Sequence, residues 1–109
     1  MAYNGSQALK IARRYQNPGG VNVETIATNK TLTYRSGQFQ LLTNTTGGAL
    51  NCTLPAEADG AYFWIRNQAG STQNISVNNP AASGVVILAP GEAALCVCDS
   101  SSWTVFFKA

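Results

Sequence analysis

From residue 21 to residue 109, short stretches of alternating apolar and polar residues are separated by clusters of Gly, Pro, Asn, Asp and Ser. Alternation with a period of two is typical of β-strands that bury one face, and the residues between the stretches are those that turns require. The pattern predicts strands at residues 21–27, 30–35, 38–43, 50–54, 61–67, 73–78, 84–89, 93–98 and 102–107. Strands spaced by about ten residues, without an exact internal repeat, indicate an all-β fold. We expect a single antiparallel β-sandwich, jelly-roll-like or a small barrel.

Two of these stretches are apolar on both faces. In the run AYFWIRN, Tyr62 and Trp64 point to one side of the strand, and Phe63 and Ile65 point to the other. The later run AALCVC is apolar throughout. A strand that is buried on both sides in a two-layer domain needs a second cover. We expect that cover to be the N-terminal segment or a neighbouring subunit.

The first twenty residues follow a different pattern. Ala8, Leu9, Ile11, Ala12 and Tyr15 recur at near-helical spacing, and the run NPGG that follows them ends any helix. A short helix and an extended arm are both compatible with this pattern. Either would be too short to be stable alone, so the segment must pack on the body of the protein or on a partner. The sequence is therefore divided into an N-terminal arm and a β-sandwich body, residues 1–20 and 21–109.

Basic residues are concentrated in this arm. Lys10, Arg13 and Arg14 have no acidic residue among the first twenty, whereas the other four basic residues share the body with five acidic ones. The net charge of +2 is too small for a nucleic-acid-binding protein, and no nucleic-acid partner is expected. Basic and apolar side chains together in a terminal segment favour a protein partner. Six residues are expected to bind it: Leu9, Lys10, Ile11, Arg13, Arg14 and Tyr15.

The composition agrees with one small β-rich domain. A chain of 109 residues is long enough to bury about two thirds of its unfolded surface. Only 11% of the residues are charged although 45% are hydrophobic, so Asn, Thr, Ser and Gln must supply the polar surface. No stretch approaches the roughly 20 apolar residues that cross a bilayer, and the start lacks the apolar region of a secretory signal. We expect a soluble protein made in the cytoplasm that does not bind a membrane.

The residue types argue against an enzyme. The chain contains no histidine, which excludes Ser-His and Cys-His catalysis and the common zinc sites. Glu57 and Asp59 lie in a loop bounded by Pro55 and Gly60, where carboxylates are solvated. No glycine-rich motif that cradles phosphate follows a predicted strand. No catalytic residue, cofactor or metal is therefore expected.

The cysteines allow two interpretations. In a strand, Cys96 and Cys98 point to the same face about 6.5–7 Å apart, which is too far for a disulfide. Cys52 also lies on an apolar strand face. We expect three reduced thiols packed in the core, where cysteine behaves as a small hydrophobic residue. The alternative is a metal or redox site made by the three thiols.

The aromatic residues also allow two interpretations. Trp103, Val105 and Phe107 share one face of the last predicted strand and are expected in the core. The alternative is an exposed platform, including Trp64, on which a carbohydrate or a nucleic acid stacks.

Residues 53–109 resemble a pattern found in β-domains of tailed-bacteriophage virion proteins, in head-decoration and fibre-associated proteins. The matching features are Thr53-Leu54-Pro55 at the end of a strand, the strand Gly60-x-x-Phe63-x-Ile65-x-Asn67, the short strand Ile75-Ser76-Val77, Pro90-Gly91-Glu92 before a buried strand, and Asp99-x-x-x-Trp103. With the two preceding strands, the resemblance covers most of residues 30–109. The N-terminal arm is outside it.

The resemblance implies a non-enzymatic structural protein of the virion. It implies a small β-sandwich that forms a homo-oligomer, commonly a trimer, and that lies on the outer capsid surface or in a fibre. The function it favours is that of a capsid decoration (cement) protein, made in the host cytoplasm, that stabilises the head by binding the major capsid protein. The alternative is a tail-fibre or head-fibre module that recognises a host glycan or anchors a fibre.

Overall fold

The computed structural model describes residues 17–109, and over this range the protein consists of strands and loops without a helix. The strands are β1 (Asn17–Ile26), β2 (Lys30–Thr31), β3 (Gly37–Asn44), β4 (Leu50–Thr53), β5 (Tyr62–Asn67), β6 (Ile75–Asn78), β7 (Gly84–Leu88), β8 (Ala93–Cys98) and β9 (Trp103–Lys108). All nine predicted strands are present, and the all-β class is confirmed. The first strand begins earlier than expected, at Asn17, because the NPGG run pairs with the start of β3.

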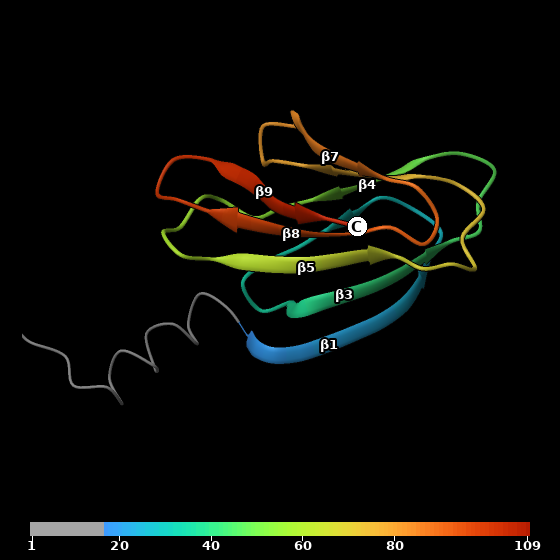
Figure 1. Cartoon of the computed structure of the whole chain (residues 1–109), viewed down its shortest axis with the longest axis horizontal. Coiled ribbons are helices and arrows are strands. Elements are labelled where there is room, and N and C mark those ends of the chain that lie inside the picture. The colour runs from blue at the N-terminus through green and yellow to red at the C-terminus, as the bar shows by residue number, and fades with distance from the viewer. Residues whose placement is uncertain (1–16) are drawn as a thin grey trace, which may run out of the picture.

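The strands form two sheets (Figure 1). The five-stranded sheet has the order β1-β3-β5-β8-β9, and the four-stranded sheet has the order β2-β4-β6-β7. From β1 to β6 the chain alternates between the sheets, so that each strand stacks in parallel on the strand two before it. Only the pairs β5-β8, β6-β7 and β8-β9 are antiparallel. The sheets are therefore mixed, and the expectation of an antiparallel fold was wrong.

The alternation between sheets explains the parallel pairing. A strand that returns to the same sheet after one visit to the other sheet runs in its original direction, whereas a tight hairpin reverses it. Val21 pairs with Phe39, eighteen residues further on, and Phe39 pairs with Trp64, twenty-five residues further on. Because the number of residues between paired positions differs from one pair of parallel strands to the next, the pairing leaves no fixed repeat in the sequence.

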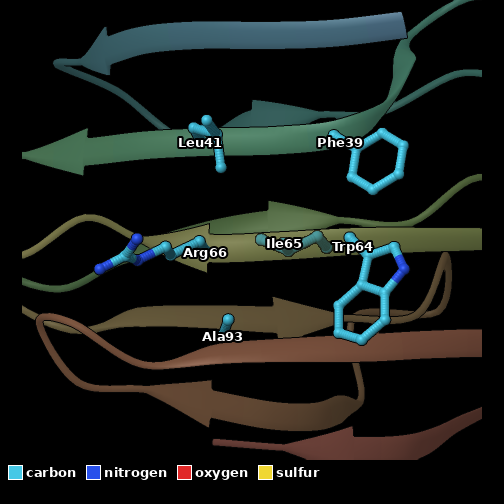
Figure 2. A pocket seen from close by; sticks show the side chains of 6 residues that line it. All are labelled: Phe39, Leu41, Trp64, Ile65, Arg66 and Ala93. Carbon is cyan, nitrogen blue, oxygen red and sulfur yellow. The ribbon is translucent and has the colours of Figure 1, made fainter. Parts of the chain in front are cut away.

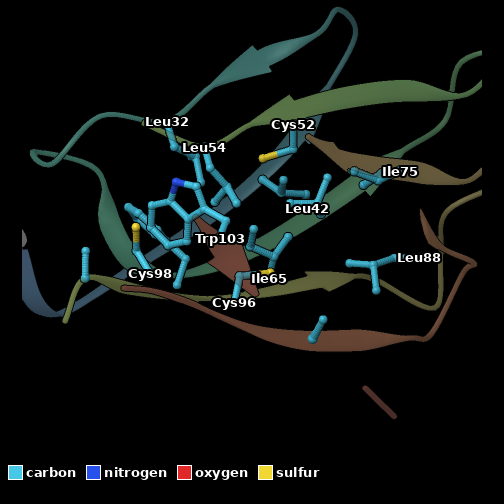
Figure 3. Packing of buried hydrophobic residues seen from close by; sticks show 14 of the residues in the cluster. Leu32, Leu42, Cys52, Leu54, Ile65, Ile75, Leu88, Cys96, Cys98 and Trp103 are labelled. Carbon is cyan, nitrogen blue, oxygen red and sulfur yellow. The ribbon is translucent and has the colours of Figure 1, made fainter. Parts of the chain in front are cut away.

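The core lies between the two sheets. Figure 3 shows Leu42 and Ile65 from the five-stranded sheet and Cys52 from the four-stranded sheet directed into the same space, and all three are fully buried. Burying a Leu or Ile side chain contributes about 1.5–3 kcal/mol. Trp103 closes one end of this core: its indole N–H donates to the Pro55 carbonyl at 2.9 Å, and its ring lies 6.0 Å from that of Phe63.

Two fully buried asparagines fix the loops that follow β3 and β5. The side-chain amide of Asn44 donates to the Gly48 and Asn74 carbonyls, each at 3.1 Å. The amide of Asn67 donates to the carbonyls of Gln73 and Leu88, at 3.0 and 2.8 Å. Each side chain thus connects two carbonyls from separate segments of the chain, which holds those segments together.

Hydrogen bonds between polar side chains connect the strands β1, β2 and β3. Lys30 donates to the Glu24 carboxylate at 2.8 Å, and the Asn22 amide donates to Glu24 and to Gln40, each at 2.9 Å. These hydrogen bonds, that from Lys30 first, lower the pKa of Glu24 below its ordinary value. The interior therefore changes from apolar to polar toward the edge strand β1.

Candidate functional site: the outer face of the five-stranded sheet

One apolar side chain from each strand of the five-stranded sheet lies in a continuous row across its outer face. Backbone pairing aligns Val21 with Phe39, Phe39 with Trp64, Trp64 with Leu95, and Leu95 with Phe107. Along the central strands the residues on either side of the row are buried, so the row itself points away from the core. We call these five residues the outer row.

The two ends of the outer row are exposed, and its three central residues, Phe39, Trp64 and Leu95, are partly buried. Val21 is 60% exposed and Phe107 is 53% exposed, and Val23, beside the row on β1, is 71% exposed. The ring of Phe107 packs edge-on against Trp64 with 6.2 Å between the centroids. Contiguous apolar surface of this kind marks an interaction site more often than single exposed apolar residues do.

A shallow hollow lies over the row. Its volume is about 240 Å³, and it is lined by Phe39, Leu41, Trp64, Ile65, Arg66 and Ala93. Figure 2 shows Phe39 and Trp64 on adjacent strands, with Leu41 and Arg66 further along the same strands. Arg66 is the only charged residue in the lining. The hollow therefore suits a large apolar side chain. An aromatic side chain there would also contact the Arg66 guanidinium at the rim of the hollow.

Phe107 was expected in the core and instead belongs to the outer row. Trp103 and Val105 face inward, opposite Cys98 and Cys96, as the alternation predicts. A bulge between Leu95 and Cys96 then shifts the register, so that Phe107 pairs with Leu95 and joins the outer face. One extra residue in a strand reverses the face of every residue beyond it, which is why the predicted face was wrong for Phe107.

The cysteines are buried and unpaired, as predicted from their positions. Burial raises the pKa of Cys52 to about 12 and that of Cys96 to about 11, and it also raises the pKa of Cys98. A thiol with a raised pKa is a poor nucleophile and a poor metal ligand at neutral pH. Between residues 17 and 109, no three Cys, Asp or Glu residues come close enough together to hold a metal ion.

The predicted partner-binding residues are Leu9, Lys10, Ile11, Arg13, Arg14 and Tyr15, and they lie outside the described residues. The structure therefore neither places them nor brings them together. The loop carboxylates Glu57 and Asp59 are exposed, as predicted. The sequence also indicated that Trp64 and its strand need a second cover. It did not identify Val21, Phe39 or Leu41 as part of the same surface, because that requires the parallel pairing of β1, β3 and β5.

The chain was compared with protein-family models, with curated proteins and with solved structures, and none of them matched it. In the described range the structure has no helix with the length and apolar character needed to cross a membrane.

Proposed function

We propose that this chain is a non-enzymatic structural protein of a bacteriophage virion, a capsid decoration protein that binds the major capsid protein on the outer capsid surface. It acts as a homotrimer and requires no cofactor. The resemblance of residues 53–109 to virion β-domains supports the phage assignment, and the structure contributes a surface suited to protein contacts. We also propose that the two sheets and the core between them form a β-sandwich related to the jelly rolls.

The observation that carries the proposal is the outer row. The five-stranded sheet packs its inner face into the core and still has an apolar side chain on the outer face of every strand. At about 25 cal/mol for each Å² removed from water, covering such a surface with protein stabilises an assembly. A protein that builds a shell needs this property, because its role is to bind other proteins.

Charge complements this apolar surface. Residues 17–109 contain four basic and five acidic residues, whereas the first sixteen residues contain three basic and no acidic ones. The excess of positive charge is thus confined to Lys10, Arg13 and Arg14. We assign capsid contact to this part of the arm, and self-association to an exposed edge of the sheets such as β1, with Val21 and Val23.

Binding to capsids that lack the protein, purified from the phage that encodes it, tests the proposal. The full chain should co-sediment with these capsids saturably and less tightly at high salt, because salt screens charge contacts. The double variant with Lys10→Glu and Arg14→Glu should stay folded and lose most of its binding. A matched control reverses two exposed cations of the body, Arg35→Glu with Lys108→Glu, and should bind as the wild type does. Absence of binding by the folded wild-type chain would refute the capsid role.

A second candidate function is a fibre module that recognises a host glycan. The aromatic side chains of Phe39, Trp64 and Phe107 on one open face favour it, since sugar rings stack on exposed aromatic rings. The test is a glycan array probed with the wild-type chain and with Trp64→Ala. Specific binding that disappears in the folded variant would replace the decoration role by this one.

A further inference from the structure

We propose that copies of this chain associate head to tail, with the edge strand β1 of one copy packed against the opposite edge strand β9 of the next. This inference rests on the proposed function and deepens it, because it specifies how the homotrimer closes. In a ring of this kind every copy covers both edges of its five-stranded sheet.

The two edges lie at opposite ends of the same sheet. The sheet has the order β1-β3-β5-β8-β9, and Figure 1 shows β1 and β9 as its outermost strands. On β1, Val21 is 60% exposed and Val23 is 71% exposed. On β9, Phe106 is 69% exposed and Phe107 is 53% exposed. Exposed apolar side chains therefore gather at both edges, and such edges are sites of association.

The strand directions allow the two edges to join in a ring. The strands β1, β3 and β5 run parallel, β8 runs antiparallel to β5, and β9 runs antiparallel to β8. The edge strand β9 therefore runs in the same direction as β1. Rotation about an axis along the strands preserves this direction, so β1 of one copy meets β9 of the next in parallel. A contact between two different surfaces, repeated by such a rotation, closes into a ring.

The order of residues along the two edges is complementary. On β1, Val23 is followed by Glu24, and on β9, Phe107 is followed by Lys108. Val23 and Phe107 both lie on the outer face of the sheet, so Glu24 and Lys108 lie on the opposite face. A parallel alignment of Val23 with Phe107 therefore places apolar side chains together on one face and Glu24 beside Lys108 on the other.

The charged residues of both edges remain accessible for this contact. The side chain of Glu24 is 41% exposed and that of Lys108 is 43% exposed, although each has an ion pair within its own chain. Residues 21–26 contain neither Lys nor Pro, the residues that commonly protect an edge strand from pairing. An acidic group at one edge and a basic group at the other favour contact between unlike edges.

A symmetric contact between two β1 edges would cover less of this surface. It would shield Val21 and Val23 and leave Phe106 and Phe107 in water on each copy. The head-to-tail contact covers both pairs with a single kind of interface. It also places Phe107 of one copy beside Val23 of the next, so the outer faces of the sheets join and stay open to other proteins.

Cysteine cross-linking tests the inference without any capsid. The three native thiols are buried, so a cysteine introduced at an edge reacts first. After mild oxidation, Val23→Cys alone and Phe107→Cys alone should run as single chains on a non-reducing denaturing gel. An equal mixture of the two variants should give a covalent dimer.

A chain with both changes tests the closure of the ring. It should give covalent dimers and trimers and nothing larger. The two cysteines of one chain cannot join each other, because five strands spaced by about 4.8 Å place the edges about 19 Å apart.

A matched control places the cysteine away from both edges. Asn51→Cys is exposed on β4, an inner strand of the other sheet, and its mixture with Val23→Cys should give no dimer. Circular dichroism checks that each variant is folded. If the loss of the contact between Phe107 and Trp64 disturbs the fold, Phe106→Cys replaces Phe107→Cys in the same experiment.

Several results would overturn the inference. Dimers that form from Val23→Cys alone as fast as from the mixture would assign β1 to a symmetric contact. A mixture without dimers would exclude the contact between β1 and β9, and covalent products larger than trimers would exclude the ring. Wild-type chains that bind capsids while the mixture does not cross-link would refute this inference alone. Cross-linked trimers that do not bind capsids would refute the proposed function alone.

Discussion

Phe63 and Trp64 are adjacent in the chain and lie on opposite faces of β5. Phe63 is fully buried against Trp103, whereas Trp64 belongs to the outer row. We predict that Phe63→Ala lowers the free energy of unfolding by about 3–5 kcal/mol, because it leaves a cavity in the core. Trp64→Ala should cost clearly less, since its site can be filled by water. Urea unfolding of both variants measures the difference, and equal losses would contradict the assigned faces.

The thiols provide a second test at the scale of single residues. Burial raises the pKa of Cys52 to about 12 and that of Cys96 to about 11. We predict that the native protein reacts with a thiol reagent such as DTNB at least an order of magnitude more slowly than the urea-unfolded chain does, because only the thiolate reacts and the core excludes the reagent. Rapid modification of three thiols at native conditions would show that they are not packed.

Three carboxylates make stability depend on pH. Lys30 lowers the pKa of Glu24, the backbone N–H of Ala89 lowers that of Glu92, and the backbone N–H groups of Ser101 and Ser102 lower that of Asp99. A pKa lowered in the folded state stabilises the protein above the ordinary values of 4.5 for Glu and 3.8 for Asp. That contribution is lost as the pH falls through the lowered folded values.

We therefore predict that the free energy of unfolding decreases as the pH is lowered from about 5 to about 3. In the variant Glu24→Gln the free energy of unfolding should decrease less over this pH range. Glu57→Gln, in an exposed loop, is the matched control and should leave the decrease unchanged. Urea unfolding across this pH range is the measurement. A stability that rises on acidification would contradict the assigned hydrogen bonds.

At the scale of elements, the close approach of the β1 and β3 backbones depends on one glycine, Gly37. A Cβ atom on Gly37 would lie 2.8 Å from the Gly20 carbonyl oxygen, so the two strands would have to separate. We predict that Gly37→Ala costs about 1–3 kcal/mol, as overpacking does elsewhere. Gly70→Ala, at a position with open space around the added atom, should cost little. Equal thermal stabilities of the two variants would show that β1 does not pack on β3 as described.

The elements themselves were predictable, and their pairing was not. Turn residues mark the strand ends clearly, as at Pro90-Gly91 and at Asp99, whose carboxylate accepts hydrogen bonds from the next turn. The β8-β9 hairpin follows from that local signal. The parallel pairing of Phe39 with Trp64 depends on packing between residues distant in sequence, and local propensity does not encode it.

The candidate site was predicted only in part for the same reason. The sequence shows that the strand of Trp64 is apolar on both faces, which implies a cover. It cannot show that Val21 and Phe39 extend this surface, because these residues are aligned only when β1, β3 and β5 pair in parallel. The bulge that turns Phe107 outward has no signal in the sequence, since the strand is apolar on both sides of it.

At the scale of the whole molecule, the outer row begins on the same edge strand that the basic arm precedes in the sequence. The outer row begins at β1, and the arm with its three basic residues enters the fold at the start of that strand. The remaining chain carries one more acidic than basic residue, which leaves the arm as the only strongly charged region. A platform with a basic arm is an arrangement suited to attachment on an acidic protein shell.

Cryo-electron microscopy of capsids with and without the bound full chain tests this account most directly. We predict additional density on the outer capsid surface, with three copies around each site and the N-terminal arm directed toward the major capsid protein. Capsids incubated with the variant Lys10→Glu, Arg14→Glu should lack this density. A saturated capsid without additional density on its outer surface, or density confined to a fibre, would contradict the account.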